Sequence, residues 1–92
     1  MYHSEISIQH PVGLHARPAA TFVRLASSFP ASITIRKVGS TSRAANAKSI
    51  LAVLSLGVNQ GDQISIDTEG EKAEEALNAL LELIRNNFGE HP

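Results

Sequence analysis

A histidine and an arginine lie close together where the chain is expected to start its first helix. Pro18 suits the first helical turn, because its missing N–H would have no partner there, and His15 and Arg17 lie just before and at that start. The first amides of a helix point outward and attract anions. Their positive field disfavours imidazolium and leaves a neutral, nucleophilic imidazole. The segment is therefore suited to carrying a phosphoryl group on His15, stabilised by Arg17 and by the amides of Ala16 and Arg17.

The plainer interpretation of His15 is a solvated side chain, because helix N-termini are common and most of them bind only water. The other histidines, His3, His10 and His91, are expected to be solvated. No two of them have metal-ligand spacing on an expected element, so no metal site is predicted. The chain has no cysteine, which excludes disulfides, cysteine-ligated zinc and thiol nucleophiles.

Length and charge narrow the class of protein. Ninety-two residues, 42% of them hydrophobic, allow one domain over residues 1–92 with a small core and no deep internal site. Eight basic and nine acidic side chains give a net charge of −1, and the scattered bases argue against nucleic-acid binding. The longest apolar run, residues 50–54, is far shorter than the ~20 residues that span a bilayer, and the N-terminus does not read as a signal peptide. We expect a soluble cytoplasmic monomer that needs no cofactor.

Strands are predicted where polar and apolar side chains alternate. Residues 5–9, 32–36 and 63–67 follow this pattern, which is typical of half-buried strands. Residues 38–46 are rich in Gly, Ser, Thr and Ala and predict a turn with a marginal third strand.

Helices are predicted from three- and four-residue apolar spacing. The first begins at Pro18 and ends before Pro30, and the longest covers residues 71–87. A short helix follows Ser49, a good N-cap, and stops at Gly57. Helices segregated on one face of a small sheet make an α+β sandwich.

Two motifs carry a resemblance to a known family. Residues 13–20 resemble the active-site signature of the HPr family, the histidine-containing phosphocarriers of the bacterial phosphoenolpyruvate:sugar phosphotransferase system. Residues 48–57 resemble its second signature, around a regulatory serine, and residues 60–62 match its next turn. The resemblance covers nearly the whole chain. It implies an open-faced β-sandwich of the order βαββαβα, with a four-stranded antiparallel sheet and three helices on one face.

The resemblance also implies a function. His15 would accept a phosphoryl group, on Nδ1 in the family, from phosphorylated enzyme I and donate it to IIA components of sugar transporters, while Arg17 neutralises charge. Such a chain is a stoichiometric carrier and not a stand-alone enzyme. An alternative of another class is a regulatory binding module of the same fold, from the nitrogen-type branch or a catabolite-repression paralogue, that acts by docking or through phosphorylated Ser49. The presence of His15 favours the carrier.

Ser49 has two compatible interpretations. It aligns with the serine that an ATP-dependent kinase/phosphorylase modifies in many Gram-positive relatives, which would add that kinase and a catabolite-control regulator as partners. It also reads as a plain helix N-cap, worth about 1 kcal/mol.

The short helix also carries a candidate docking surface. Its apolar side chains are hard to bury all at once, so some of them should be exposed to a partner. The resemblance implies that enzyme I and the IIA components dock on a patch formed by Ala16, Ala20, Arg24, Lys48, Ile50, Leu51 and Leu54.

One segment departs from the family pattern. Residues 38–47 are about three residues longer than usual before the second motif, and a longer surface hairpin is the simplest explanation because loops tolerate insertions. The register of the third strand is left open by this insertion.

Overall fold

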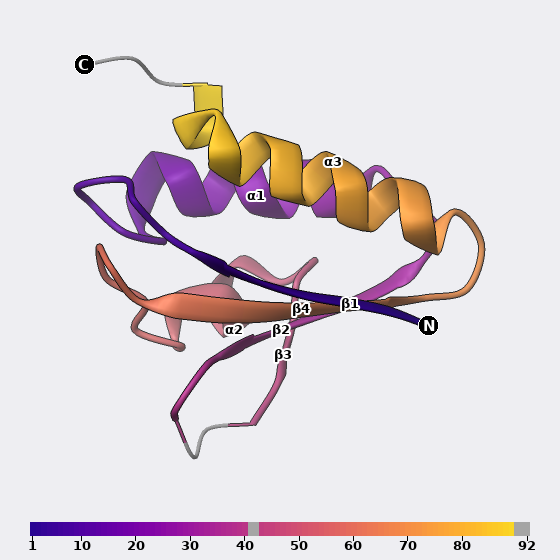
Figure 1. Cartoon of the computed structure of the whole chain (residues 1–92), viewed down its shortest axis with the longest axis horizontal. Helices are drawn as coiled ribbons and strands as arrows, with labels where there is room; N and C mark the ends of the chain where they lie inside the picture. Colours follow the sequence, from indigo (N-terminus) through magenta and orange to yellow (C-terminus); the bar gives the residue numbers. More distant parts are fainter. Residues whose placement is uncertain (41–42, 90–92) are drawn as a thin grey trace.

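The computed structural model describes residues 1–40 and 43–89, which form one layer of β-sheet and one layer of helices (Figure 1). The order along the chain matches the predicted order, with a short 3₁₀ turn added at the end. The elements are β1 (Tyr2–Ser7), α1 (Ala16–Ser27), β2 (Ser32–Lys37), β3 (Ala45–Asn46), α2 (Ile50–Leu54), β4 (Gln63–Glu69), α3 (Ala73–Arg85) and η1 (Asn87–Gly89).

The sheet is antiparallel throughout, with the strands in the order β1-β4-β2-β3. Alternation along the strands turns Ile33, Ile35, Ile64 and Ile66 into the core, where each is at most 1% exposed. Ile66 pairs with Ile35 across β4 and β2, so the apolar faces of the two central strands are in register. This continuous apolar face is what the helices cover.

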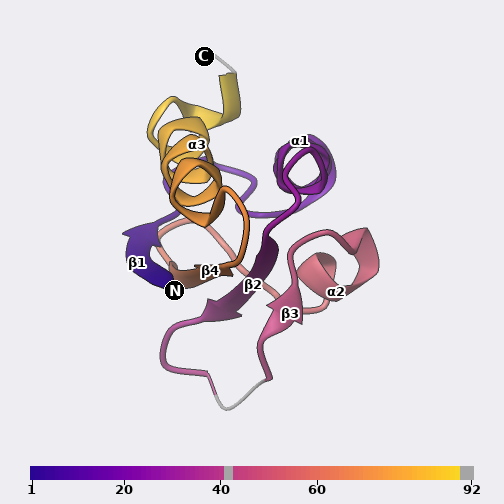
Figure 2. The same ribbon diagram turned by 90° about the vertical axis from the view of Figure 1, so that its right-hand side faces the viewer.

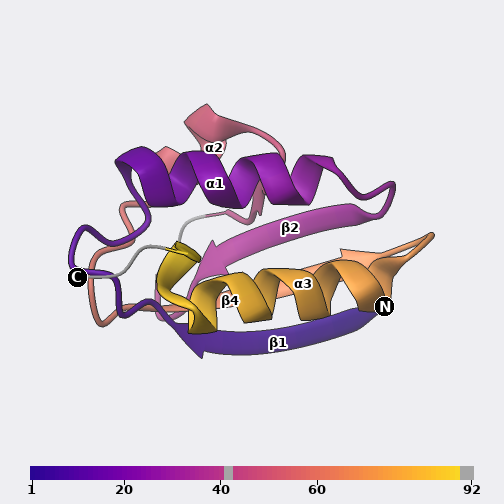
Figure 3. The ribbon, with the colours of Figure 1, turned by 90° about the horizontal axis from the view of Figure 1, so that it is seen from above.

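Helices α1 and α3 lie side by side over this face, and α2 lies next to α1 at the β3 edge (Figures 2 and 3). Each long helix buries one apolar stripe, as the three- and four-residue spacing predicts. The buried residues are Pro18, Ala19, Phe22 and Ala26 on α1, and Ala73, Ala76, Leu77, Leu80, Leu81 and Ile84 on α3. The predicted open-faced α+β sandwich is confirmed.

The boundaries of several elements differ from the sequence-based prediction, most clearly in β1, α1 and α3. β1 begins at Tyr2 rather than at residue 5, because its polar first half pairs with β4 through backbone bonds that need no apolar side chain. α1 begins at Ala16, two residues before Pro18. α3 ends at Arg85 rather than at residue 87, because Asn87 adopts a left-handed φ of 55° that cannot continue a helix.

The weak third strand exists but is short. Ala45 and Asn46 pair with Ile35 and Thr34 of β2, which fixes the register that the sequence left open. Part of the long hairpin, residues 41–42, lies outside the described residues.

One predicted environment is wrong: His10, expected to be solvated, is 6% exposed. Its ring packs edge-on against Phe88 with 5.9 Å between centroids, and its Nδ1 accepts the Val12 N–H at 3.1 Å. The cause is tertiary, since the 3₁₀ turn after α3 brings Phe88 back over the loop that follows β1. His3 is exposed as expected, with Nδ1 2.6 Å from Oδ1 of Asp67, and His91 lies outside the described residues.

No helix within residues 1–40 and 43–89 is long and apolar enough to cross a membrane. In the same part of the chain, no group of three or more histidine or acidic side chains is placed to hold a metal ion.

Candidate functional site

The loop that carries His15 rests directly on a second loop from the other half of the chain. Gly13 has φ +77°, and a Cβ added there would lie 2.5 Å from the Val58 carbonyl oxygen and 2.7 Å from Cα of Asn59. The Leu14 N–H donates to the Val58 carbonyl at 3.0 Å, and the Leu14 side chain is fully buried. Glycine is therefore required at position 13 both by its backbone conformation and by the close approach. This contact holds the backbone just before His15 against the second loop.

His15 is the N-cap of α1, yet its side chain does not cap the helix. The backbone is extended, with φ −131° and ψ 168°, and the imidazole is half-buried. Its Nε2 lies 3.1 Å from Oδ1 of Asn59. Because this is the hydrogen bond that the ring makes within the described chain, Nδ1 is left without a protein partner there. The ring is held by one nitrogen and presents the other.

The first residues of α1 surround the ring with positive potential. Ala16 has φ +49°, a left-handed conformation that costs on the order of 1–3 kcal/mol outside glycine and is frequent at functional sites. The first turn contains no acidic side chain, so the positive end of the helix dipole is not neutralised locally. Ala16 and Arg17, the two residues that follow His15, are both exposed.

Ser49 is confirmed as the N-cap of α2. Its Oγ accepts the Ala52 N–H at 3.3 Å, and the side chain is half-buried. The neighbouring Lys48 donates from Nζ to the Phe29 carbonyl at 2.7 Å. This bond ties the start of α2 to the end of α1, so Lys48 has a structural role that the sequence did not predict.

Most of the predicted docking residues lie on α1 and α2, which are neighbours in space (Figure 3), and Lys48 lies just before α2 and is half-buried. On α2, Leu51 is 77% exposed, and Ile50 and Leu54 are 38% and 36% exposed. Val53 is the residue of this helix that is fully buried. On α1, Arg24 is exposed and Ala20 is half-buried. The short helix thus leaves several apolar side chains uncovered, as expected.

Sequence reasoning missed two residues near His15. Asn59 contacts His15 although the two residues are 44 positions apart in the chain, and no local sequence pattern predicts such a contact. Val12, in the loop before His15, is an apolar side chain that is 48% exposed. Its place between Pro11 and Gly13 in a turn could have signalled exposure.

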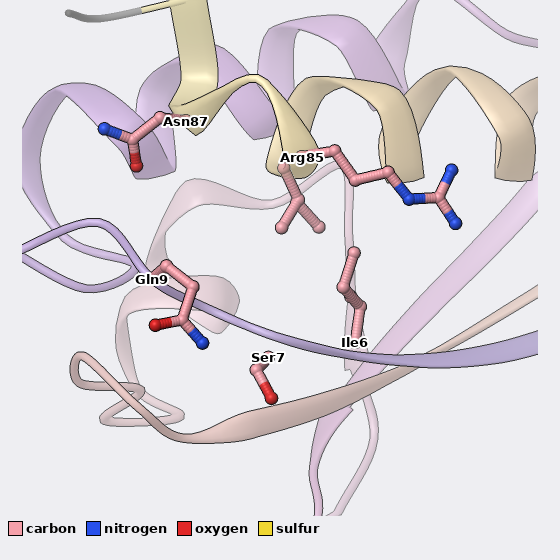
Figure 4. A pocket seen from close by; sticks show the side chains of 6 residues that line it. Ile6, Ser7, Gln9, Arg85 and Asn87 are labelled. Carbon is pink, nitrogen blue, oxygen red and sulfur yellow. The ribbon is translucent and has the colours of Figure 1, made fainter.

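A separate pocket lies between the end of β1 and the C-terminal end of α3 (Figure 4). It has a volume of about 520 Å³. None of the predicted site residues lines it; the lining residues are Ile6, Ser7, Gln9, Ile84, Arg85 and Asn87.

A small open-faced sandwich that presents one histidine nitrogen at the start of its first helix, beside an arginine, defines the class of histidine phosphocarrier domains. The family described as "PTS HPr component phosphorylation site" matches residues 2–86 of the chain. The chain belongs to the HPr family, and it is a phosphocarrier component of the phosphotransferase system rather than a stand-alone enzyme.

Similar proteins agree with this assignment. The phosphocarrier protein HPr of Pseudomonas aeruginosa is 43% identical over 86 residues, covering 94% of this chain and 93% of that protein. Among solved structures, HPr of Thermoanaerobacter tengcongensis superposes with a TM-score of 0.92 at 43% identity over the full length of both chains. Crh of Bacillus subtilis, a catabolite-repression protein, superposes with a TM-score of 0.71 at 33% identity, covering 95% of this chain and 97% of that one.

Proposed function

We propose that His15 is the residue that accepts and donates the phosphoryl group, and that Nδ1 is the reacting atom. The observation that carries the proposal is the contact between Nε2 of His15 and Oδ1 of Asn59 at 3.1 Å. An amide oxygen accepts a hydrogen bond and cannot donate one, so this contact favours the tautomer with the proton on Nε2 and a lone pair on Nδ1.

The other described histidines are poorer candidates. His10 is buried and its Nδ1 already accepts the Val12 N–H. His3 lies on β1 beside Asp67 and Glu5, whose negative charges would repel an incoming phosphoryl group.

The transfer exchanges one nitrogen–phosphorus bond for another. The Nδ1 lone pair attacks phosphorus and the bond to the histidine of phosphorylated enzyme I breaks. His15 keeps its Nε2 proton and becomes a phosphoimidazolium, while the departing histidine, whose other nitrogen carries a proton, leaves as neutral imidazole. The same steps in the other direction pass the group from His15 to a IIA component. The amides of Ala16 and Arg17 and the Arg17 guanidinium stabilise the added negative charge during both steps.

The partners dock on the exposed faces of α1 and α2. The family implies enzyme I and the IIA components as partners. Leu51 would supply the apolar centre of the contact, and Arg24 and Arg17 would favour acidic partner surfaces. The remaining predicted members of the patch are Ala16, Ala20, Lys48, Ile50 and Leu54. Transient docking of this kind suits a monomer that works in the cytoplasm.

Mass spectrometry of the intact protein tests the acceptor site. The protein is incubated with phosphoenolpyruvate, Mg²⁺ and an enzyme I that is active on its own carrier. We expect one acid-labile phosphoryl group on the wild-type chain and none on His15→Ala, while His3→Ala behaves as wild type. A phosphoryl group that persists on His15→Ala would refute the assignment of the site.

A second, regulatory function rests on Ser49. Its half-buried hydroxyl lies beside exposed Ile50 and Leu51, so a phosphate there would add negative charge next to the proposed docking patch. An ATP-dependent kinase/phosphorylase would be the modifying enzyme, and a catabolite-control regulator would read the modified form. Incubation with such a kinase and ATP should add an acid-stable phosphate to the wild type and none to Ser49→Ala. The absence of that phosphate on the wild type would remove this function.

A further inference from the structure

The turn that holds Asn59 is closed by reciprocal hydrogen bonds with Asp62. The Asn59 N–H donates to Oδ2 of Asp62 at 2.8 Å, and the Asp62 N–H donates to the Asn59 carbonyl at 3.0 Å. These two bonds fix the backbone of the residue whose side chain contacts His15. The backbone position from which the Asn59 side chain reaches the imidazole is therefore held by Asp62.

Lys37 fastens this turn to the sheet. Its Nζ lies 3.4 Å from Oδ2 of Asp62 and donates to the Gly57 carbonyl at 3.3 Å. Lys37 ends β2, and the pairing of β2 with β4 brings it opposite Ile64, two residues after Asp62. One ammonium group thus binds both ends of the loop on which the His15 segment rests.

The same loop supports the backbone of the His15 segment. Leu14 donates to the Val58 carbonyl, and Gly13 approaches Val58 and Asn59 so closely that no side chain fits between them. The imidazole of His15 and the backbone before it are therefore both held by the same turn. The hydrogen bond from the Asn59 N–H also lowers the pKa of Asp62, with a smaller lowering by Lys37, which shows that both partners favour the ionised carboxylate.

We propose that Asp62 and Lys37 are positioning residues for phosphoryl transfer, which act through Asn59 to hold the His15 ring with Nε2 bonded and Nδ1 presented. Neither touches the phosphoryl group. Their effect comes from restricting the ring to the geometry in which the Nδ1 lone pair lies in line with the incoming phosphorus. This inference rests on the proposed role of His15 as acceptor.

The test is a double-mutant cycle on Asn59 and Asp62, read out by steady-state phosphorylation with enzyme I and phosphoenolpyruvate. The kcat and KM measured are those of enzyme I with each variant as its phosphoryl acceptor. Asn59→Ala and Asp62→Ala should each lower this kcat about fivefold, while KM stays within about twofold because the docking face is unchanged. The double variant should be no slower than Asn59→Ala alone, because Asp62 acts only through Asn59. Asp62→Asn retains an acceptor for the Asn59 N–H and should recover most of the lost kcat.

Asp67→Ala is the matched control. The Asp67 side chain is 36% exposed, against 32% for Asp62, and it lies on β4, but its side-chain partner is His3 and not Lys37. Its kcat should equal that of the wild type. Additive losses in the double variant, or an unchanged kcat in Asp62→Ala, would overturn the proposal.

Nitrogen-15 NMR of the unphosphorylated protein separates this inference from the proposed function. In the wild type, the neutral His15 ring should show its proton on Nε2 with slowed exchange, and both features should weaken in Asp62→Ala. If they do not change, the positioning role is wrong even where His15→Ala abolishes phosphorylation. If the wild type takes no phosphoryl group, the proposed function fails, and the NMR result still decides whether Asp62 orients the ring.

Discussion

The Nε2 atom of His15 lies 3.1 Å from Oδ1 of Asn59, and the two residues are 44 positions apart in the chain. The contact joins the start of α1 to the turn before β4 and decides which imidazole nitrogen faces outward. It turns a histidine at a helix N-terminus, which by itself is a common feature, into one with a defined reactive atom.

Replacing Gly13 should damage both the fold and the site. Gly13→Ala places a Cβ 2.5 Å from a backbone oxygen at φ +77°, so we expect a loss of about 2–4 kcal/mol of unfolding free energy in urea titrations. Gly57→Ala is the control, because its φ is +66° with no atom within 4 Å of the added Cβ, and its loss should be only about 1 kcal/mol. Equal losses would show that the close approach to Val58 is unimportant.

Leu51→Glu should separate docking from stability. Leu51 is 77% exposed, so the unfolding free energy should change by less than about 0.5 kcal/mol. Binding to enzyme I, measured by calorimetry, should weaken about tenfold, because an apolar contact is replaced by a charge. The neighbouring core variant Val53→Ala should do the reverse and lower the thermal midpoint, since Val53 is fully buried. A large fall in the midpoint of Leu51→Glu would mean that Leu51 supports the core.

Ser49 variants should distinguish the helix cap from the effect of charge. Ser49→Ala loses the hydrogen bond to the Ala52 N–H and should cost about 1 kcal/mol of unfolding free energy. Ser49→Asp keeps an N-cap acceptor, so it should retain the stability and weaken enzyme I binding through its added charge. Binding equal to that of the wild type in Ser49→Asp would argue against regulation at this position.

The pH dependence of stability should carry a contribution from Asp62. Its pKa in the folded protein is lowered from the usual 3.8, chiefly by the Asn59 N–H, so folding is favoured by the ionised form. That contribution is complete above about pH 5 and disappears as the pH falls through the folded-state pKa. Urea titrations should therefore show wild type and Asp62→Asn differing at pH 7 and converging as the pH falls below the folded-state pKa, which lies under 3.8. A constant difference across this range would contradict the lowered pKa.

Local sequence patterns were sufficient for much of the fold. The alternation in residues 32–36 and 63–67 and the apolar spacing of the two long helices depend on short periods that a chain displays directly. Ser49 was recognisable as an N-cap because a serine before an apolar helical run supplies the acceptor that the first amides need. The place of His15 just before α1 followed in the same way from Pro18, three residues further on, although the helix begins two residues before Pro18.

The tertiary structure decided which segments distant in sequence pair, pack and form hydrogen bonds with one another. β1 gained its first residues from pairing with β4, and His10 became buried because Phe88 returns over it from beyond α3. The contact of His15 with Asn59, and the bonds of Asp62 and Lys37 that hold Asn59, join three separate parts of the chain. A linear pattern records which side chains prefer burial and which local turns are allowed. It does not record which polar atoms meet once the helices pack on the sheet, because those meetings are set by the packing of the whole core.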